Sequence, residues 1–580
     1  MASSDKPLKG LTVKVSDLVQ AGGAKLPASA VQVRYAIAVV PGELPTTEHA
    51  KAALKFLDRN LSDELSQGKS HLPVGRFDGL LDTIPAEIPV SRAPVIPEDY
   101  YGRKVDRTSL TGGAVAPLWF TVRVPKAAKA GAYQGQITIS AEGLTAVSVP
   151  LRVNVSDWVV PAPQEFRLSH TPVHSDYPVA WHYEVPVWSD KHFEMIGKAH
   201  ALMAEAGSRQ FHLSLIATYV DRSIPASIKN GCDSGLIRWI KQPDGKYKHD
   251  LTAFDKYLEM AATAGGTPRP LRLQAWQYSR AGSPGAASPV RPPPDVSVFD
   301  PQTGKIERMQ APKPGTDEAV AFWQPAFNDI LKRLKDRGWQ DATVFAWVAF
   351  YGGPDEATAE LAEKLWPQAT WFVCNHEVDR DWRDGNNHWV KLRYGNTAYN
   401  YRQPSVRGYR ALLDPRPVFM TDICRQIVRD WTPLIHQRRI AEDMAMSGMD
   451  GIGDFGIDLF MYRRPDGSIS RSGAGDSPSG PGQSQYSLLY PGPDGPVATE
   501  RYEMFREGLV MTEALLFVER AIQAKKLSPA LHERAEKALE ARSRAFFMDW
   551  FAIRDMPAAE DAKLLDLAGE VAREVGRGKK

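Results

Sequence analysis

Cysteine, net charge and long apolar runs are all scarce in this sequence. Only three cysteines occur, Cys232, Cys374 and Cys424, and none forms a C-x-x-C pair, so neither a disulfide framework nor a structural zinc site is indicated. The 71 Lys and Arg residues balance 69 Asp and Glu residues, and a net charge of +2 provides no field to hold nucleic acid. No run approaches the roughly 18 consecutive apolar residues of a membrane-spanning helix.

Signals for export and for several common chemistries are also missing. The opening residues, Met-Ala-Ser-Ser-Asp-Lys-Pro, lack the apolar core of a signal peptide. No P-loop, H-E-x-x-H motif or EF-hand loop occurs, and no G-x-S-x-G elbow follows a strand. The 13 histidines are dispersed. We therefore expect no cofactor and no metal.

Aromatic and turn-forming residues are plentiful instead. The 580 residues, enough for several domains at roughly 100–200 residues each, include 15 Trp, 19 Tyr and 21 Phe beside 44 Pro and 45 Gly. Sugar-handling proteins have this composition because the C–H faces of a pyranose stack on aromatic rings. Large barrels with thick cores have it too, so the composition leaves both interpretations open.

Residues 1–160 show period-two alternation of apolar and polar residues between Pro- and Gly-rich spacers. This pattern predicts an antiparallel β-sandwich as an accessory domain. The prolines of Asp157–Pro163 favour a linker, which places the boundary there. The expected strands include Val31–Val40, Leu118–Val124, Tyr133–Ser140 and Ser148–Val155.

Residues 161–500 change to short apolar runs that alternate with helical periodicity. Eight strands alternating with helices predict a (β/α)₈ barrel, with a doubly wound open sheet as the alternative. The helical patterns are clearest at His192–Ala206, Thr252–Ala264, Ala319–Gly338 and Thr358–Trp366. The eight strand candidates are Phe166–His170, Phe211–Ile216, Leu271–Trp276, Thr343–Phe350, Thr370–Cys374, Trp389–Tyr394, Pro417–Thr421 and Asp450–Phe455.

Residues 501–580 read as helical throughout. Amphipathic stretches with i, i+4 charge pairs recur, the later ones at Ala530–Phe547 and Glu560–Val575. We expect this C-terminal region to pack on the barrel as a small helical bundle.

Seven stretches in order along the chain carry a family resemblance: Val115–Lys126, Ala130–Ile139, Val185–His192, Arg238–Tyr247, Gly448–Gly453, Leu488–Gly495 and Arg501–Gly508. The first two resemble the accessory β-domain of glycoside hydrolase family 123-type proteins. The others resemble a related, largely uncharacterised bacterial group of catalytic domains. The resemblance implies a β-sandwich followed by a glycosidase barrel, which agrees with the pattern-based prediction.

The resemblance also implies a reaction. In family 123 an adjacent Asp-Glu pair at the end of a barrel strand acts on the substrate: the Glu protonates the leaving group, and the Asp orients the 2-acetamido group of the sugar as the nucleophile. It implies hydrolysis of a terminal glycosidic bond in an oligosaccharide or glycoconjugate, such as that of a β-linked N-acetylgalactosamine, with retention of configuration. An exported, periplasmic or extracellular location is implied as well.

Asp355 and Glu356 are the candidate catalytic pair. They are the only Asp-Glu just beyond a predicted strand, but the family's pair is usually followed by proline, whereas here Pro354 precedes it. Aligning on that proline places Gly352 and Gly353 where the carboxylates belong. Both acids then become ordinary first-turn residues of the next helix, where the helix dipole favours them.

Three other acids at predicted strand ends are alternatives. Asp422 ends the seventh strand, and Asp454 and Asp458 follow the eighth. Each has a plain structural interpretation, because an Asp after a strand often caps the following helix.

Six residues near strand ends are candidates for substrate binding. An aromatic platform would use rings such as Trp276, Tyr351 and Tyr394, and hydrogen bonds to sugar hydroxyls would use Asn375, His376 and His170, although His376 also reads as an ordinary structural residue.

Two rival functions remain open. One is a non-catalytic glycan-binding protein that has lost its acid pair. The other is a hydrolase or lyase on non-acetamido sugars that uses Asp422 and Asp454.

Overall fold

The computed structural model describes most of the chain. The described residues are 2–39, 76–90, 99–100, 103–104, 113–174, 176–217, 235–276, 293–348, 353–375, 390–397, 407–413, 418–422, 434–458, 460, 488–548 and 558–577. Two compact units are present. The first comprises residues 1–160, 433–438 and 497–580, and the second comprises residues 161–432 and 439–496.

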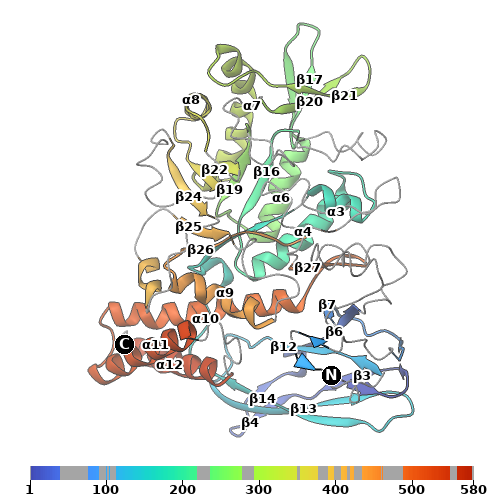
Figure 1. Ribbon diagram of the computed structural model, residues 1–580, viewed down its shortest axis with the longest axis vertical. Coiled ribbons are helices and arrows are strands. Elements are labelled where there is room, and N and C mark those ends of the chain that lie inside the picture. Colours follow the sequence, from blue (N-terminus) through green and yellow to red (C-terminus); the bar gives the residue numbers. More distant parts are fainter. Residues whose placement is uncertain are drawn as a thin grey trace. The chain divides into compact units, whose positions relative to one another are not determined.

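The first unit contains two main antiparallel sheets (Figure 1). The three-stranded sheet has the order β12 (Leu118–Val122), β6 (Val31–Val39), β7 (Arg76–Leu81). The five-stranded sheet has the order β14 (Val147–Val155), β13 (Gly131–Ser140), β4 (Leu18–Gln20), β5 (Lys25–Leu26), with β3 (Thr12–Val15) also on β13. Short pairs complete the sheets: β1 (Ala2–Ser4) with β11 (Ala114–Ala116), β2 (Leu8–Lys9) with β8 (Glu87–Ile88), and β9 (Asp99–Tyr100) with β10 (Arg103–Lys104).

The two main sheets share a core. Leu18 and Tyr133 from the five-stranded sheet pack with Val31 of the three-stranded sheet, and Phe120 and Val122 lie against them. The alternation of the sequence explains this, since every second side chain of a strand points to the same face. The four strands predicted here are confirmed, and the N-terminal sheets are antiparallel as expected.

Three C-terminal helices belong to this same unit. They are α10 (Glu500–Gln523), α11 (Pro529–Met548) and α12 (Ala558–Arg577). Arg34 of β6 donates to Glu503 of α10 at 2.6 Å, and both side chains are only 6% exposed. The hydroxyl of Ser156 donates to the carbonyl of Leu565 at 2.8 Å. Buried polar contacts of this kind therefore join segments more than 400 residues apart in the sequence.

The second unit is built on one sheet of eight parallel strands. Every predicted strand of this region is present in it, shifted by at most three residues at its start. The strands are β15 (Ser169–Val173), β16 (Phe211–Ser214), β19 (Leu271–Gln274), β22 (Thr343–Val348), β23 (Trp371–Asn375), β24 (Leu392–Thr397), β25 (Val418–Asp422) and β26 (Gly451–Gly456).

The order of these strands is β15-β26-β25-β24-β23-β22-β19-β16. Chain neighbours pair with one another, and the first strand pairs with the last, which is the order of a (β/α)₈ barrel cut between β15 and β16. A doubly wound sheet would instead reverse its order at a switch point. The closed barrel stays a prediction, while the parallel sheet with its connecting helices is observed.

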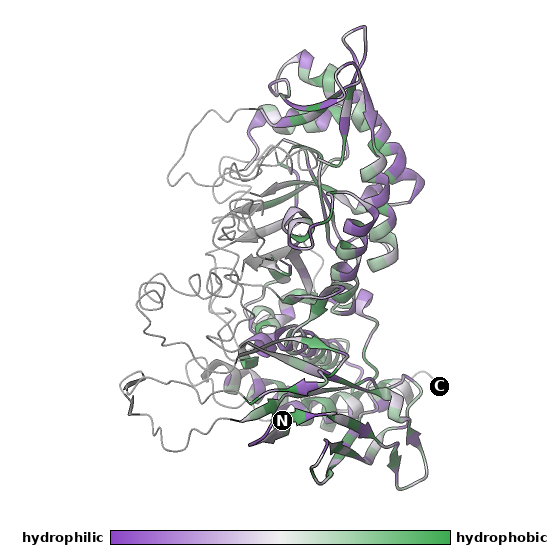
Figure 2. Cartoon of the chain, turned by 90° about the vertical axis from the view of Figure 1, so that its right-hand side faces the viewer, coloured by the Kyte–Doolittle hydropathy of each residue, from purple (hydrophilic) through white to green (hydrophobic). Residues whose placement is uncertain are grey.

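Helices alternate with the strands in the second unit. They are α3 (Asp176–His182), α4 (Asp190–Glu205), α6 (Thr252–Gly265), α7 (Asp317–Asp336) and α8 (Glu356–Leu365), followed by α9 (Leu434–Met446), which runs from the first unit into the second. Ser189, Thr316 and Asp355 cap α4, α7 and α8 with side-chain oxygens. Figure 2 shows both hydrophilic and hydrophobic stretches on these helices, as expected for helices that cover a sheet.

Two long connections of the second unit form a small sheet of their own, which the sequence analysis did not predict. Its order is β18 (Tyr247–Asp250), β17 (Arg238–Lys241), β20 (Asp295–Asp300), β21 (Lys305–Gln310). The ring of Trp239 stacks on Phe322 of α7 with centroids 5.5 Å apart, which anchors this sheet to the helix. Figure 1 shows the small sheet beyond the ends of β16 and β19.

A final hairpin, β27 (Leu489–Gly492) and β28 (Gly495–Ala498), precedes α10. Among the helices of the described ranges, none has the length and apolar character needed to cross a bilayer.

Candidate functional site

The two faces of the parallel sheet have different surroundings. On one face, Phe345 of β22 and Trp371 of β23 pack with centroids 5.2 Å apart, and Phe327 of α7 lies 5.5 Å from Phe345. On the other face, Val344, Ala346, Phe372 and Tyr394 form a separate buried cluster. The alternation of the strands separates these sets, so the second face is the one directed away from α7.

Buried polar side chains gather on this second face at β16 and β19. The register pairs His212 with Arg272 and Ser214 with Gln274. His212 Nε2 donates to Gln274 Oε1 at 3.0 Å. Arg272 is 1% exposed, donates to Gln210 Oε1 at 3.3 Å, and lies 4.1 Å from the centroid of the Phe372 ring. Polar groups are costly to bury without partners, and these two hydrogen bonds supply partners for Arg272 and Gln274.

The carboxyl ends of β15 and β26 bring a histidine and an acid together. His174 follows β15, Asp458 follows β26, and His174 Nδ1 forms an ion pair with Asp458 Oδ2. The two side chains are 4% and 0% exposed. The His200 ring of α4 lies 4.8 Å from the His174 ring, centroid to centroid, and burial together with the charge of His174 lowers the pKa of His200 well below its usual value.

Asp458 also affects the pKa of Tyr183. Its hydroxyl donates to the carbonyl of Gly492 at 3.1 Å. Burial raises the pKa of Tyr183, and the charge of Asp458 raises it further. Asp458 is thus a buried acid that lies against His174 and helps to raise the pKa of the Tyr183 phenol. At 0% exposure it cannot itself reach a sugar in this conformation.

His170 lies within β15 and is also buried. Its Nε2 donates to the carbonyl of Ala206 at 2.9 Å. Burial lowers the pKa of His170 to about 4, which the hydrogen bond to Ala206 partly opposes, so the ring is neutral near pH 7. Among the described residues, no group of three or more His, Cys, Asp or Glu side chains is arranged to hold a metal ion.

Asp355 and Glu356 stand at the start of α8, in the connection that follows β22. Asp355 is the N-cap: its Oδ1 accepts from the backbone N–H of Thr358 at 2.9 Å. Glu356 is the first residue of the helix and is exposed. This is the arrangement expected for ordinary first-turn acids, and it is compatible with a Glu356 side chain available to a ligand.

Two other predicted acids stand on neighbouring strands. Asp422 ends β25, and its register partner on β26 is Gly453, which precedes Asp454. Asn375 is the last residue of β23. Parallel strands direct their carboxyl ends to one edge, so these backbones lie on the edge that also holds His174 and Asp458. Tyr351 and His376 lie outside the described residues, and the roles predicted for them stay predictions.

Trp276 and Tyr394 are both buried aromatic residues. Trp276 follows β19 and packs against Phe327 and Phe345 with centroids 5.8 and 4.8 Å away, on the helix-covered face. The Trp276 ring is therefore part of the core and does not form an exposed platform. Because β19 ends at Gln274, the alternation of the strand does not determine which way Trp276 points. Tyr394 is 5% exposed and packs near Phe372, on the face away from α7.

Several polar residues of this site were missed by the sequence analysis. Gln210, Arg272 and Gln274 lie in or beside strands that were judged by their apolar residues alone. The signal was present, since Arg272 and Gln274 alternate with leucines in Leu271–Gln274. Alternation in a strand covered by a helix on one face indicates a polar second face.

Comparisons with known proteins agree with this arrangement. The model of the glycoside hydrolase 123 catalytic domain matches residues 174–352, and that of the glycoside hydrolase 123 N-terminal domain matches residues 1–141. A family 123 glycoside hydrolase from Clostridium perfringens, whose structure was solved for the details of glycolipid glycan hydrolysis, is 13% identical, with 99% of this chain and 91% of that chain covered and a TM-score of 0.62. A family 39 glycoside hydrolase from Bacteroides cellulosilyticus is 11% identical, with 70% and 74% covered and a TM-score of 0.33. Among curated proteins, none matches.

The catalytic-domain match begins at His174, directly after β15, and spans the next three strands of the parallel sheet, β16, β19 and β22. The N-terminal match covers antiparallel strands of the first unit. The chain is therefore built as a glycoside hydrolase with an accessory β-domain. More narrowly, it belongs to the family 123-type glycoside hydrolases, and its substrate is accordingly a glycan.

Proposed function

We propose that this protein removes a terminal N-acetylhexosamine, such as β-linked N-acetylgalactosamine, from an oligosaccharide or glycoconjugate. The observation that carries the proposal is the eight-stranded parallel sheet whose carboxyl edge holds His174, Asp458 and the backbones of Asp422 and Asn375. Glycan sites on such sheets lie at this edge. We also propose an exported location, in line with the family resemblance.

We propose further that the sheet closes into a ring between β15 and β16. Two residues just before β16 already contact β15: Gln210 Nε2 donates to the carbonyl of Pro172 at 3.3 Å, and Ser208 Oγ donates to that of His170 at 3.5 Å. A closed ring would enclose the polar side chains of Arg272 and Gln274 in its interior, directly beneath the edge where the glycan binds.

Glu356 is the proton donor in this proposal. It is exposed at the start of α8, and a helix N-terminus follows the carboxyl end of β22. Asp355 holds the helix start through Thr358. The second carboxylate, which orients the acetamido group, then comes from Asp355 or from Asp422 at the end of β25.

The bond changes follow from these assignments. Glu356 delivers a proton to the glycosidic oxygen, the bond between that oxygen and the anomeric carbon breaks, and the leaving group departs as an alcohol. The acetamido oxygen of the substrate bonds to the anomeric carbon from the opposite face, which gives a cyclic oxazolinium ion. The carboxylate beside the acetamido N–H stabilises that cation. Glu356 then accepts a proton from water while the water oxygen bonds to the anomeric carbon on the face that the leaving group occupied. The bond from the acetamido oxygen to that carbon breaks, the oxazolinium ring opens, and the configuration is retained.

The experiment compares Glu356→Gln, Asp422→Asn and the unmodified protein on a chromogenic N-acetyl-β-galactosaminide and on the plain β-galactoside. We expect the unmodified protein to cleave only the acetamido substrate, and we expect Glu356→Gln to lower turnover of that substrate at least about a hundredfold. Loss only with Asp422→Asn would move the acid to β25. Cleavage of the plain galactoside would overturn substrate assistance, because that sugar has no acetamido group.

A second candidate function is glycan binding without hydrolysis. The capping role of Asp355 favours it, since that carboxylate is already occupied by the N–H of Thr358. A glycolipid-derived oligosaccharide is a suitable probe because the similar Clostridium protein concerns glycolipid glycans. Binding of this oligosaccharide without release of any monosaccharide would support the second candidate and exclude the first.

A further inference from the structure

A small pocket lies beyond the carboxyl end of β16, within the second unit. Its volume is about 180 Å³, which is room for about six waters at roughly 30 Å³ each, or for one sugar ring. Gly235 and Leu236 line it, and the N–H of Leu236 donates to the carbonyl of Ser214, the last residue of β16, at 2.8 Å. The pocket is therefore attached to the same edge of the sheet as the proposed glycan site.

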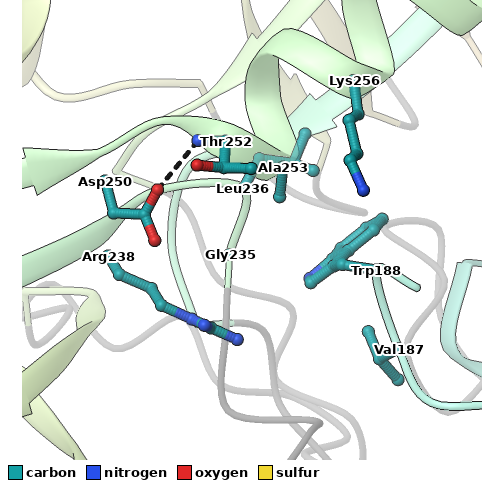
Figure 3. A pocket seen from close by; sticks show the side chains of 9 residues that line it. All are labelled: Val187, Trp188, Gly235, Leu236, Arg238, Asp250, Thr252, Ala253 and Lys256. Atoms are coloured by element: carbon teal, nitrogen blue, oxygen red, sulfur yellow. Dashed lines mark hydrogen bonds between the residues drawn. The ribbon is translucent and has the colours of Figure 1, made fainter. Parts of the chain in front are cut away.

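Charges of both signs line this pocket. Arg238 of β17 and Asp250 of β18 are register partners, and Lys256 of α6 stands across from them (Figure 3). Asp250 Oδ1 accepts from the N–H of Thr252 at 2.9 Å, and Lys256 Nζ is 2.5 Å from Asp190 Oδ1. Within the part of the chain that the structure describes, the Arg238 guanidinium makes no hydrogen bond or ion pair, so its donors face the pocket.

The Trp188 side of the pocket is held in an unusual conformation. Trp188 has φ of 61°, in the left-handed region that bulky residues rarely adopt. Its N–H donates to Nδ1 of the buried His192 at 3.0 Å, and its ring packs near Tyr177 and Phe193. Strained residues held in this way by their surroundings occur preferentially where a side chain or backbone serves a ligand.

We propose that this pocket is a second glycan subsite that binds a single neutral sugar unit. Sugar hydroxyls donate to a carboxylate and accept from a guanidinium or ammonium group at the same time, which suits Asp250 beside Arg238 opposite Lys256. A simple anion would be repelled by Asp250 and by Asp190 behind Lys256. The inference rests on the proposed function only because it takes a glycan as the ligand. In addition, it assigns this pocket to a sugar unit of that glycan away from the bond that is cleaved.

The test uses saturation-transfer NMR of the full chain with methyl α-galactoside, methyl α-glucoside and methyl α-N-acetylgalactosaminide. We expect at least one to bind with a Kd on the order of 1 mM, as a ligand of this size allows. Arg238→Met should weaken that binding about tenfold or more, because it removes charged hydrogen bonds. Lys256→Met is the second variant and should act in the same direction.

Lys246→Met is the matched control, since Lys246 lies in the exposed turn between β17 and β18 and does not line the pocket. It should change the Kd less than about twofold. The inference is overturned if none of the three glycosides binds, or if Arg238→Met and Lys256→Met bind as the control does. Release of N-acetylhexosamine from an oligosaccharide, measured separately, shows whether the proposed function fails on its own.

Discussion

Substitution of Asp355 separates a structural role from a catalytic one more sharply than any other single change. Its carboxylate accepts from the N–H of Thr358 at 2.9 Å, and its backbone has the extended conformation of an N-cap, with φ of −71° and ψ of 165°. Alanine cannot accept this bond, whereas asparagine caps as well as aspartate does. The pair Asp355→Ala and Asp355→Asn therefore tests the cap while holding the position constant.

The expected magnitudes follow from the geometry. Asp355→Ala should lower the free energy of unfolding by about 1 kcal/mol, which shifts the melting temperature by about 2–4 °C in a domain of this size. Asp355→Asn should stay within about 0.5 kcal/mol of the unmodified protein. Differential scanning calorimetry measures both, and a chromogenic N-acetyl-β-galactosaminide reports turnover.

Two results would refute this reasoning. If Asp355→Asn is as destabilised as Asp355→Ala, the cap is not what Asp355 contributes. If Asp355→Asn keeps its stability but loses turnover about a hundredfold or more, the carboxylate acts on the substrate and the family's catalytic pair is Asp355 and Glu356 after all.

Three further predictions concern buried charges. Burial lowers the pKa of His170 from 6.5 to about 4, so the unfolded state binds a proton between these pH values that the folded state does not bind. The free energy of unfolding should therefore fall by about 3 kcal/mol as pH decreases from 6.5 to 4. His170→Gln should remove this part of the pH dependence, measured by urea unfolding. Burial raises the pKa of Asp443 from 3.8 to about 7, so the folded state keeps a proton that the unfolded state releases. The free energy of unfolding should therefore fall by about 2–3 kcal/mol between pH 5 and pH 8, and Asp443→Asn should abolish this decrease. The same pH dependence in Asp443→Asn would contradict this prediction. Glu503→Ala should cost about 3–5 kcal/mol in urea unfolding, because it leaves Arg34 buried without its 2.6 Å partner, and a cost under about 1 kcal/mol would show that the pair adds nothing.

Local patterns in the sequence were sufficient to predict the strands of the parallel sheet and several helices of the second unit. Apolar runs such as Thr343–Phe350 carry β-branched and aromatic residues over the length of a strand, and the intervening stretches repeat at helical spacing. The eight strands, and helices such as α4 and α7, are confirmed for that reason. The start of β15 was misjudged because Phe166 and Leu168 are buried outside the strand.

Features that depend on contacts between distant residues were not predictable in the same way. The strand β20 pairs with β21 and also with β17, although β18, α6 and β19 lie between β17 and β20 in the sequence, and no local pattern encodes that pairing. The grouping of α10 with β6 depends on Arg34 and Glu503, which look like ordinary surface charges in the sequence. The predicted packing of the C-terminal helices on the barrel stays a prediction.

The candidate site also contains some features that the sequence could predict and others that it could not. Position after a strand was enough to select Asp422, Asp458 and Asn375, because the carboxyl edge of a parallel sheet follows from the strand order. The direction of a side chain could not be predicted in this way. Trp276 lies two residues beyond the end of β19, and its ring packs into the helix-covered core. The partner of Asp458 was also out of reach, since His174 stands 284 positions earlier and meets it only through the pairing of β15 with β26.

The division of the chain into units has a consequence for its synthesis. Residues 1–160 leave the ribosome before residues 161–496, yet their unit is completed only by residues 497–580, which emerge later. The parallel sheet between them can fold while the early strands still wait for α10 and for Glu503 to neutralise Arg34. Emergence of residues 497–580, rather than of residues 1–160, should therefore set the moment at which the N-terminal sheets become resistant to proteolysis.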